Sequence, residues 1–233
     1  MTAADTFIGE DQSGIGSITV NSAGSSLTNI GDMNVGFQGD GTLNVLNSGA
    51  ASNANGTIGS QAGSVGTATV DGAGSTWAST GDLFIGYGGT GTLNILNGGA
   101  VSDSDGRVAS DVGSVGTVIV SGAGSSWTNA ATLAVGVVGN GTLNIANGGA
   151  VSDVDGVIGL ASNSIGAVTV DGAGSTWANT GVVLVGSLGA GTLTIANGAV
   201  VSATAARIPN KSIPPAPSTL AARLGPQPPG RGF

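Results

Sequence analysis

The sequence contains no cysteine and no histidine. Without cysteine the chain has no disulfide and no thiolate metal site, and the absence of histidine removes the commonest general base and zinc ligand. Only 8% of the residues are charged and 3% are aromatic, so neither salt-bridge networks nor a large aromatic core can stabilise the chain. We therefore expect stability to come from backbone hydrogen bonds and from small, regularly stacked side chains.

Basic residues are also scarce, with five Lys and Arg against 13 Asp and Glu, and only Arg107 precedes Ala206. The net charge of −8 disfavours nucleic acid as a partner, because phosphate binding needs clustered basic side chains. No apolar run is long enough for a membrane span. Residues 1–8 lack a basic region followed by an apolar run, so we expect no signal peptide in this chain.

Glycine, in contrast, is abundant, with 45 residues, and it marks a repeat. The stretch 91–102 recurs almost unchanged at 41–52 and 141–152, and with small edits at 191–202, always at an offset of 50 residues. A diverged copy at 66–77 lies halfway between, so the underlying period is about 25 residues. A fixed period of this size indicates a solenoid, in which each unit buries its apolar face only against its neighbours.

Within each half-unit, side chains alternate in the way that marks a strand. The first strand, such as 92–95, has apolar residues at its second and fourth positions in every copy, and mostly Thr or Asn at the positions between them. Two more short strands and three Gly-rich corners complete about 25 residues. The pattern predicts an all-β fold, a parallel β-helix (β-solenoid) with three short strands per coil and apolar ladders inside.

The repeat and the composition divide the chain in two. Residues 1–208 are predicted to form a β-helix of four 50-residue repeats, about eight coils, that starts in the middle of a coil. All seven prolines lie at or after Pro209, and proline cannot donate to a sheet ladder. We expect 209–233 to be a disordered, Pro-rich basic tail, in which 218–225 is able to form a short helical turn. An uncapped solenoid end favours end-to-end self-association.

The segments 70–77 and 85–95, with their copies 50 residues away, resemble the autotransporter-associated repeats of type V secretion passengers. Such repeats also occur in proteins with a PEP-CTERM sorting signal. The resemblance covers about residues 7–208 and implies a right-handed β-helix outside a Gram-negative cell, often as an adhesin stalk that contacts host or bacterial surface glycans or proteins. The chain lacks the signal peptide and the C-terminal translocating barrel of whole passengers, which suggests a fragment or a truncated gene product.

One outward face is a candidate binding surface. Its residues repeat a Thr-x-Thr or Thr-x-Asn pattern, which suits a flat polar face for polysaccharide or ice. The alternative is that Thr favours strands and that hydroxyl and Asn ladders bond between coils. The candidate residues are Thr67, Thr69, Thr92, Asn94, Thr117, Thr142 and Asn144.

Two pairs of carboxylates are weak calcium candidates. Asp103 and Asp105, and in the next repeat Asp153 and Asp155, precede a glycine, and paired carboxylates before a Gly turn can wrap a hard cation. The equivalent positions 53–56 carry Asn instead, and Asx-rich turns also form without metal. We therefore expect no metal and no cofactor.

Three tryptophans, Trp77, Trp127 and Trp177, recur 50 residues apart. Exposed, they could stack on sugar rings, but small residues occupy the alternate half-units, and large–small alternation is typical of a packed core. Core packing is the favoured interpretation. Because the carboxylates repeat with the scaffold instead of gathering in one coil, we expect no enzyme. The sequence favours a non-catalytic structural or adhesive segment of an autotransporter-like surface passenger, with a ligand-binding solenoid as the alternative.

Overall fold

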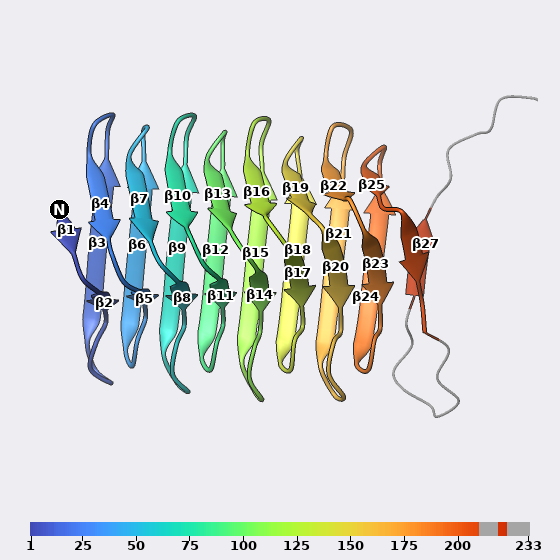
Figure 1. Cartoon of the computed structure of the whole chain (residues 1–233), viewed down its shortest axis with the longest axis horizontal. Coiled ribbons are helices and arrows are strands. Elements are labelled where there is room, and N and C mark those ends of the chain that lie inside the picture. Colours follow the sequence, from blue (N-terminus) through green and yellow to red (C-terminus); the bar gives the residue numbers. More distant parts are fainter. Residues whose placement is uncertain (210–218, 223–233) are drawn as a thin grey trace, which may run out of the picture.

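The computed structural model describes residues 1–209 and 219–222, and all the regular elements in these ranges are strands (Figure 1). The chain winds into a β-solenoid of about eight coils, in which three parallel nine-stranded sheets run along the rod. The predicted all-β parallel architecture, with three strands per coil of about 25 residues, is confirmed. Within the described ranges there is no helix long and apolar enough to cross a membrane.

Each sheet takes every third strand of the chain. Sheet A consists of β1 (Thr2–Ala3), β4 (Ser26–Asn29), β7 (Ala50–Asn53), β10 (Thr76–Ser79), β13 (Ala100–Asp103), β16 (Ser126–Asn129), β19 (Ala150–Asp153), β22 (Thr176–Asn179) and β25 (Val200–Ser202). Sheet B consists of β2 (Thr6–Ile8), β5 (Met33–Val35), β8 (Gly56–Ile58), β11 (Leu83–Ile85), β14 (Gly106–Val108), β17 (Thr132–Val135), β20 (Asp155–Ile158), β23 (Val182–Val185) and β26 (Ala205–Arg207). Sheet C consists of β3 (Ile15–Asn21), β6 (Asp40–Leu46), β9 (Val65–Asp71), β12 (Thr90–Leu96), β15 (Val115–Ser121), β18 (Asn140–Ala146), β21 (Ile165–Asp171), β24 (Ala190–Ala196) and β27 (Thr219–Ala222).

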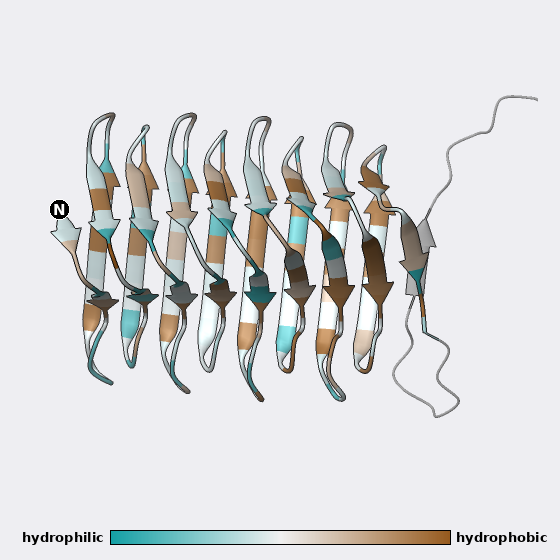
Figure 2. Cartoon of the chain, viewed as in Figure 1, coloured by the Kyte–Doolittle hydropathy of each residue, from teal (hydrophilic) through white to brown (hydrophobic). Residues whose placement is uncertain are grey.

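The register stacks equivalent residues on one another. In sheet C, Leu93 pairs with Ala68 and Val118, and Ile95 pairs with Val70 and Val120. All of these side chains are buried, and they form continuous apolar ladders along the axis (Figure 2). The predicted inward ladders are therefore confirmed, and every strand except the end ones completes its backbone hydrogen bonds with the coils on both sides.

The three tryptophans belong to this core. Trp77, Trp127 and Trp177 lie on sheet A, point inward and are fully buried. Each pairs in register with small or medium aliphatic residues, as Trp127 does with Val101 and Val151. The prediction that they pack in the core is confirmed.

At the corner between sheets B and C the chain turns on a glycine. Gly86 has φ of +71°, and a Cβ atom there would collide with the carbonyl oxygen of Val115 in the next coil. Glycine adopts this left-handed conformation without strain, and the equivalent corner after the next strand of sheet B carries Ala109, with φ of +61°.

The C-terminal segment differs in part from its prediction. Thr219–Ala222 form β27, which pairs in parallel with β24, so the helical turn suggested for 218–225 is wrong at these residues. The physical reason is that β24 offers an unpaired strand edge, and an edge can be paired by a backbone of almost any sequence. The rest of the predicted disordered tail, 210–218 and 223–233, lies outside the described residues.

Candidate functional site

The predicted Thr/Asn face exists as one surface. Its seven residues lie on sheet C with half-buried side chains on the outer side of the strands. In one column Thr67, Thr92, Thr117 and Thr142 follow one another in register, about 4.8 Å apart as neighbouring strands are. The sheet thus presents a straight row of threonines along the rod.

The second column of this face is less regular. It runs through Thr69, Asn94, Ile119 and Asn144 in register. The Nδ2 of Asn94 donates a long hydrogen bond of 3.5 Å to Oγ1 of Thr69, as expected for a ladder that bonds between coils. Ile119 interrupts the polar column, so the hydroxyl groups do not form a continuous two-dimensional lattice.

The four calcium candidates are separated by the solenoid wall. Asp103 and Asp153 point into the core and are 5% and 4% exposed. Asp105 and Asp155 lie at the corner between sheets A and B, where their Oδ1 atoms accept the backbone N–H groups of Thr132 at 2.8 Å and Val182 at 2.7 Å. Among residues 1–209 and 219–222, no group of three or more acidic side chains is placed to hold a metal ion.

The two inward carboxyl groups have unusual electrostatics. Burial raises the pKa of Asp103 to about 7, against the lowering effect of the hydrogen bond from Trp127, and the charges of Asp82 and Asp105 raise it further. Burial raises the pKa of Asp153 to about 7 in the same way, opposed by the hydrogen bond from Trp177 and assisted by Asp155. Both carboxyl groups therefore titrate near neutral pH.

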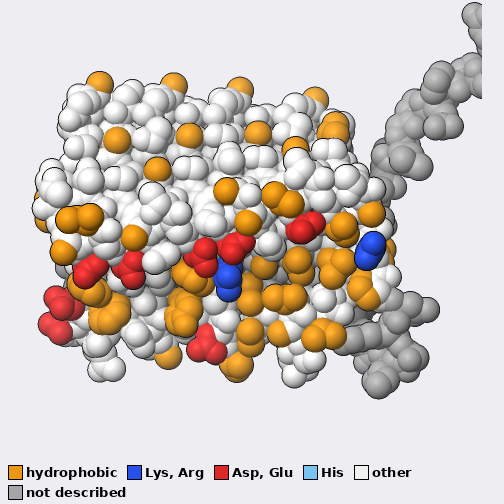
Figure 3. Space-filling model, in the orientation of Figure 1, with side chains coloured by type: hydrophobic (Ala, Val, Ile, Leu, Met, Phe, Trp, Pro, Cys, Tyr) orange, Lys and Arg blue, Asp and Glu red, His pale blue; other side chains and the backbone are white. Residues whose placement is uncertain are grey.

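The acidic row at the corner between sheets A and B serves the scaffold (Figure 3). Five side chains of this row, four Asp and one Asn, accept a backbone N–H group one coil further along the chain, which fixes the corner of the next coil, whereas Asp82 pairs with Arg107. The acceptors are Asp5 for Asp32 (2.8 Å), Asp32 for Asn55 (3.1 Å), Asn55 for Asp82 (3.0 Å), Asp105 for Thr132 and Asp155 for Val182. This ladder repeats with the coil and marks no single place on the rod.

One place does depart from the repeat, and we call it the Arg107 cluster: Asp82, Phe84, Tyr87, Asp105 and Arg107. The Arg107 guanidinium lies 3.4 Å from Oδ2 of Asp82 and 3.4 Å from Oδ2 of Asp105. It also lies 5.7 Å from the centre of the Phe84 ring, which meets the Tyr87 ring edge-on at 5.4 Å. Phe84 and Arg107 are register partners on the outer side of sheet B.

This cluster was not predicted from the sequence, although the sequence contains a signal for it. Arg107 is the only basic residue before Ala206 and Tyr87 is the only tyrosine of the chain. What the sequence did not make evident is the register of sheet B at this coil. An offset of 23 residues, not 25, places Arg107 beside Phe84 and against carboxylates from two successive coils.

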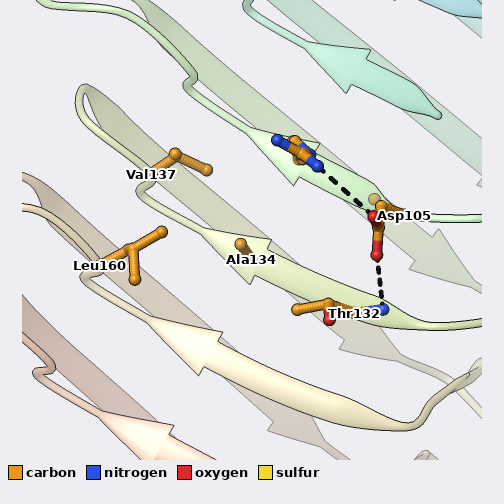
Figure 4. Close-up of a pocket in the computed structure, with 7 residues that line it drawn as sticks. Asp105, Thr132, Ala134, Val137 and Leu160 are labelled. Carbon is orange, nitrogen blue, oxygen red and sulfur yellow. Dashed lines mark hydrogen bonds and ion pairs between the residues drawn. The ribbon is translucent and has the colours of Figure 1, made fainter.

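A shallow hollow adjoins the cluster on sheet B (Figure 4). Its volume is about 200 Å³. Ala134 is its small central side chain, between the register partners Arg107 and Val157. The lining residues are Asp105, Gly106, Arg107, Thr132, Ala134, Val137 and Leu160.

The cluster and the hollow together combine three kinds of contact. The guanidinium of Arg107 offers hydrogen-bond donors, the carboxylates of Asp82 and Asp105 offer acceptors, and the Phe84 and Tyr87 rings offer apolar surface. Sugars present hydroxyl groups beside apolar C–H faces, so this combination suits a polyhydroxylated ligand better than a charged one. Comparisons of the chain with protein-family models, with curated proteins and with solved structures found no match.

Proposed function

We propose that this chain is a non-catalytic structural and adhesive segment of an autotransporter-like surface passenger. The observation that supports this most is the acidic ladder at the corner between sheets A and B, in which carboxylates bind backbone N–H groups of the next coil. Polar groups that hold the scaffold make a stiff rod of even cross-section, about 38 Å long for eight coils at about 4.8 Å each. Such a rod suits a spacer that carries a contact surface away from a cell.

The resemblance of the repeats to type V passengers supports a proposed location at the cell surface, with surface glycans or proteins as the proposed partners. The test is to insert the full chain between a signal peptide and a translocating β-barrel and to measure protease accessibility on intact cells. Display of a protease-resistant rod supports the proposal. The control is Leu93→Asp, which places a charge in the core ladder and should abolish the resistance. A chain that stays inside the cell in both forms contradicts the proposal.

A ligand-binding solenoid for polysaccharide or ice is the second candidate function. The Arg107 cluster favours it, because this local break in the repeat combines aromatic, cationic and anionic groups. The Thr/Asn face is the competing surface, and the row from Thr67 to Thr142 is its regular part.

Glycan-array binding and ice recrystallisation separate these possibilities. Binding that is lost in Phe84→Ala and kept in Thr57→Ala, its register partner on the same side of sheet B, assigns the ligand to the Arg107 cluster. Loss in Thr92→Val with Thr117→Val assigns it to the Thr/Asn face. Inertness of the full chain in both assays contradicts the ligand-binding candidate and leaves the spacer.

A further inference from the structure

Polar side chains form a column inside the solenoid, at the end of the sheet A strands. These residues point inward and are almost fully buried, although the surrounding core is aliphatic. We call them the inner polar column: Asn29, Asn53, Ser79, Asp103, Asn129, Asp153 and Asn179. Each polar atom in such a place needs a hydrogen-bond partner, because an unpartnered buried group costs about 1–3 kcal/mol.

Three members of the column are acceptors for tryptophan. The indole N–H groups of Trp77, Trp127 and Trp177 donate to Oδ1 of Asn53, Oδ2 of Asp103 and Oδ2 of Asp153, each at 2.6 Å. Where the tryptophan is replaced by Leu27, the equivalent column position is Ala3, which needs no partner. A polar acceptor is therefore present in the column wherever sheet A carries a tryptophan.

The second oxygen of each carboxyl group has no partner. Oδ1 of Asp103 and Oδ1 of Asn129 are both buried and without a hydrogen bond, and these two residues are register partners in neighbouring strands. The same holds for Oδ1 of Asp153 and Oδ1 of its register partner Asn179. In each pair two buried acceptors lie in adjacent coils, and one proton between them would satisfy both.

Asn53, two coils before Asp103, shows the hydrogen bonds that the column makes when such a donor is present. Asn53 accepts from Trp77 with its Oδ1, and its Nδ2 donates to Oγ of Ser79 at 3.0 Å. Ser79 is the register partner of Asn53, as Asn129 is of Asp103. A carboxylate lacks the donor that the amide has, whereas a carboxylic acid has one in the same position.

We propose that Asp103 and Asp153 are neutral carboxylic acids in the folded solenoid at mildly acidic pH. Each accepts the tryptophan N–H group with Oδ2 and donates its own O–H from Oδ1 to the Oδ1 atom of Asn129 or Asn179. The consequence is a rod whose folding takes up two protons, so that it is more stable in acid than at neutral pH.

The surrounding charges agree with this assignment. Asp82 and Asp105 are the charged groups that act on Asp103, and Asp155 is the one that acts on Asp153. All three are acidic and favour the neutral form. Arg107, the cation of this region, pairs with Asp82 and Asp105 on the outer side of the wall. The strands of sheet A that flank the two residues, β10, β16 and β22, carry no titratable side chain.

The direction of the pH effect follows from the pKa values. The pKa of both groups is about 7 in the folded chain, above the ordinary value of 3.8. The stability that they contribute is full below pH 3.8 and is lost as the pH rises towards 7. Between these limits each proton changes the unfolding constant about tenfold per pH unit, and two protons change it up to about 100-fold.

The test is the denaturant midpoint of the full chain from pH 4 to pH 8, compared with the variant Asp103→Asn/Asp153→Asn. The amides reproduce the native arrangement of Asn53, so we expect the variant to fold. The pH dependence of its unfolding free energy should be smaller than that of the unmodified chain by the equivalent of up to two protons. The control, Asp71→Asn/Asp171→Asn, removes the same charge at the two Asp positions whose carboxylates bind Asn97 and Asn197 near the surface. It should keep the slope of the unmodified chain.

Two outcomes would overturn the assignment. The first is an identical pH slope in the unmodified chain and in the Asp103→Asn/Asp153→Asn variant. The second is a carboxyl carbon NMR signal of Asp103 or Asp153 that titrates at an ordinary, surface-like pH. The reverse variant, Asn53→Asp, gives an independent check. Because Ser79 offers an acceptor for the new carboxylic acid, folding of this variant should take up about one more proton, which steepens the pH dependence of the unfolding free energy. An unchanged pH dependence counts against the proposal.

Discussion

Gly106 lies against the indole of Trp127, so closely that a Cβ atom on Gly106 would come within 2.7 Å of Cζ2 of the ring. Gly156 and Trp177 have the same relationship, at 2.6 Å. In the first coil the glycine is replaced by Thr6 and the tryptophan by Leu27. A large ring on sheet A and a missing side chain on sheet B thus depend on each other across the core.

This dependence predicts a measurable coupling. Gly106→Thr should destabilise the chain by about 1–3 kcal/mol, because it overfills the space beside the Asn129 side chain and the Trp127 ring. Trp127→Leu alone should also destabilise it, because it leaves a cavity and an unpartnered Asp103. The double variant recreates the Thr6 and Leu27 combination. Its destabilisation should be smaller than the sum of the two single-variant values by about 0.5–3 kcal/mol.

Equilibrium denaturation of the two single variants and the double variant gives the coupling energy. The matched control combines Gly106→Thr with Trp177→Leu, two coils away, for which the costs should add. If the single-variant costs add up to the cost of the double variant in both combinations, the indole and the glycine are energetically independent.

Most of the fold could be predicted from the sequence, because each coil of the solenoid corresponds to one half of a sequence repeat. The inward positions, such as Leu93 and Ile95, alternate with outward ones in every copy, and the 25-residue period gives the register of sheet C. Sheets A and B follow the 50-residue repeat instead, because their offsets alternate between 24 and 26 residues in sheet A and between 23 and 27 in sheet B. The segment Thr219–Ala222 could not be predicted this way. It follows the last repeat after a Pro-rich segment, so the period of the repeat does not extend to it, although Leu220 and Ala222 pair in register with Leu193 and Ile195.

The candidate sites were predicted less completely. The Thr/Asn face follows from alternation alone, since Thr92 and Asn94 occupy outward positions. For Asp103 and Asp105 the carboxylates looked like a pair, but a strand end and a corner direct them to opposite sides of the wall. The Arg107 cluster joins side chains from successive coils, so it depends on which outward residue of one coil meets which of the next.

The separation of Asp103 from Asp105 predicts that calcium has no effect on stability. The thermal unfolding midpoint should be the same with excess Ca²⁺ and with a chelator. Asp105→Asn should change stability by less than about 1 kcal/mol, since the exposed ion pair with Arg107 contributes little and Asn55 fills the equivalent role natively. A rise in the midpoint with Ca²⁺ that Asp105→Asn abolishes would establish a calcium site.

The corner after sheet C depends on asparagines in the left-handed conformation. Asn97 has φ of +50°, and its Nδ2 donates to Oδ1 of Asp71 in the previous coil at 2.8 Å. Asn97→Ala should cost about 1–2 kcal/mol, because alanine pays the strain of this conformation without the hydrogen bond. Asn97→Gly should cost less, and chemical denaturation of both variants checks the order. A glycine variant as unstable as the alanine variant would assign the cost to the hydrogen bond alone.

The same region contains a buried hydroxyl that closes the loop from sheet C to sheet A. Oγ of Ser125 donates to the carbonyl oxygen of Ser121 at 2.8 Å and accepts the N–H group of Gly98 in the previous coil at 3.0 Å. Ser75 makes both equivalent contacts, and Ser175 accepts the equivalent N–H group, of Gly148; all three serines are fully buried. One hydroxyl therefore serves both its own corner and the contact between two coils.

Removal of this hydroxyl should weaken both contacts at once. We expect Ser125→Ala to cost about 1–3 kcal/mol, because the part-buried N–H group of Gly98 loses the Oγ acceptor, and to speed amide hydrogen exchange at Gly98. The control is Ser126→Ala at the adjacent, partly exposed residue. If exchange at Gly98 is unchanged while stability falls, the cost arises within the corner of Ser125 itself. If both variants are equally stable, the hydroxyl does not join the coils, since that role requires a loss confined to the buried serine.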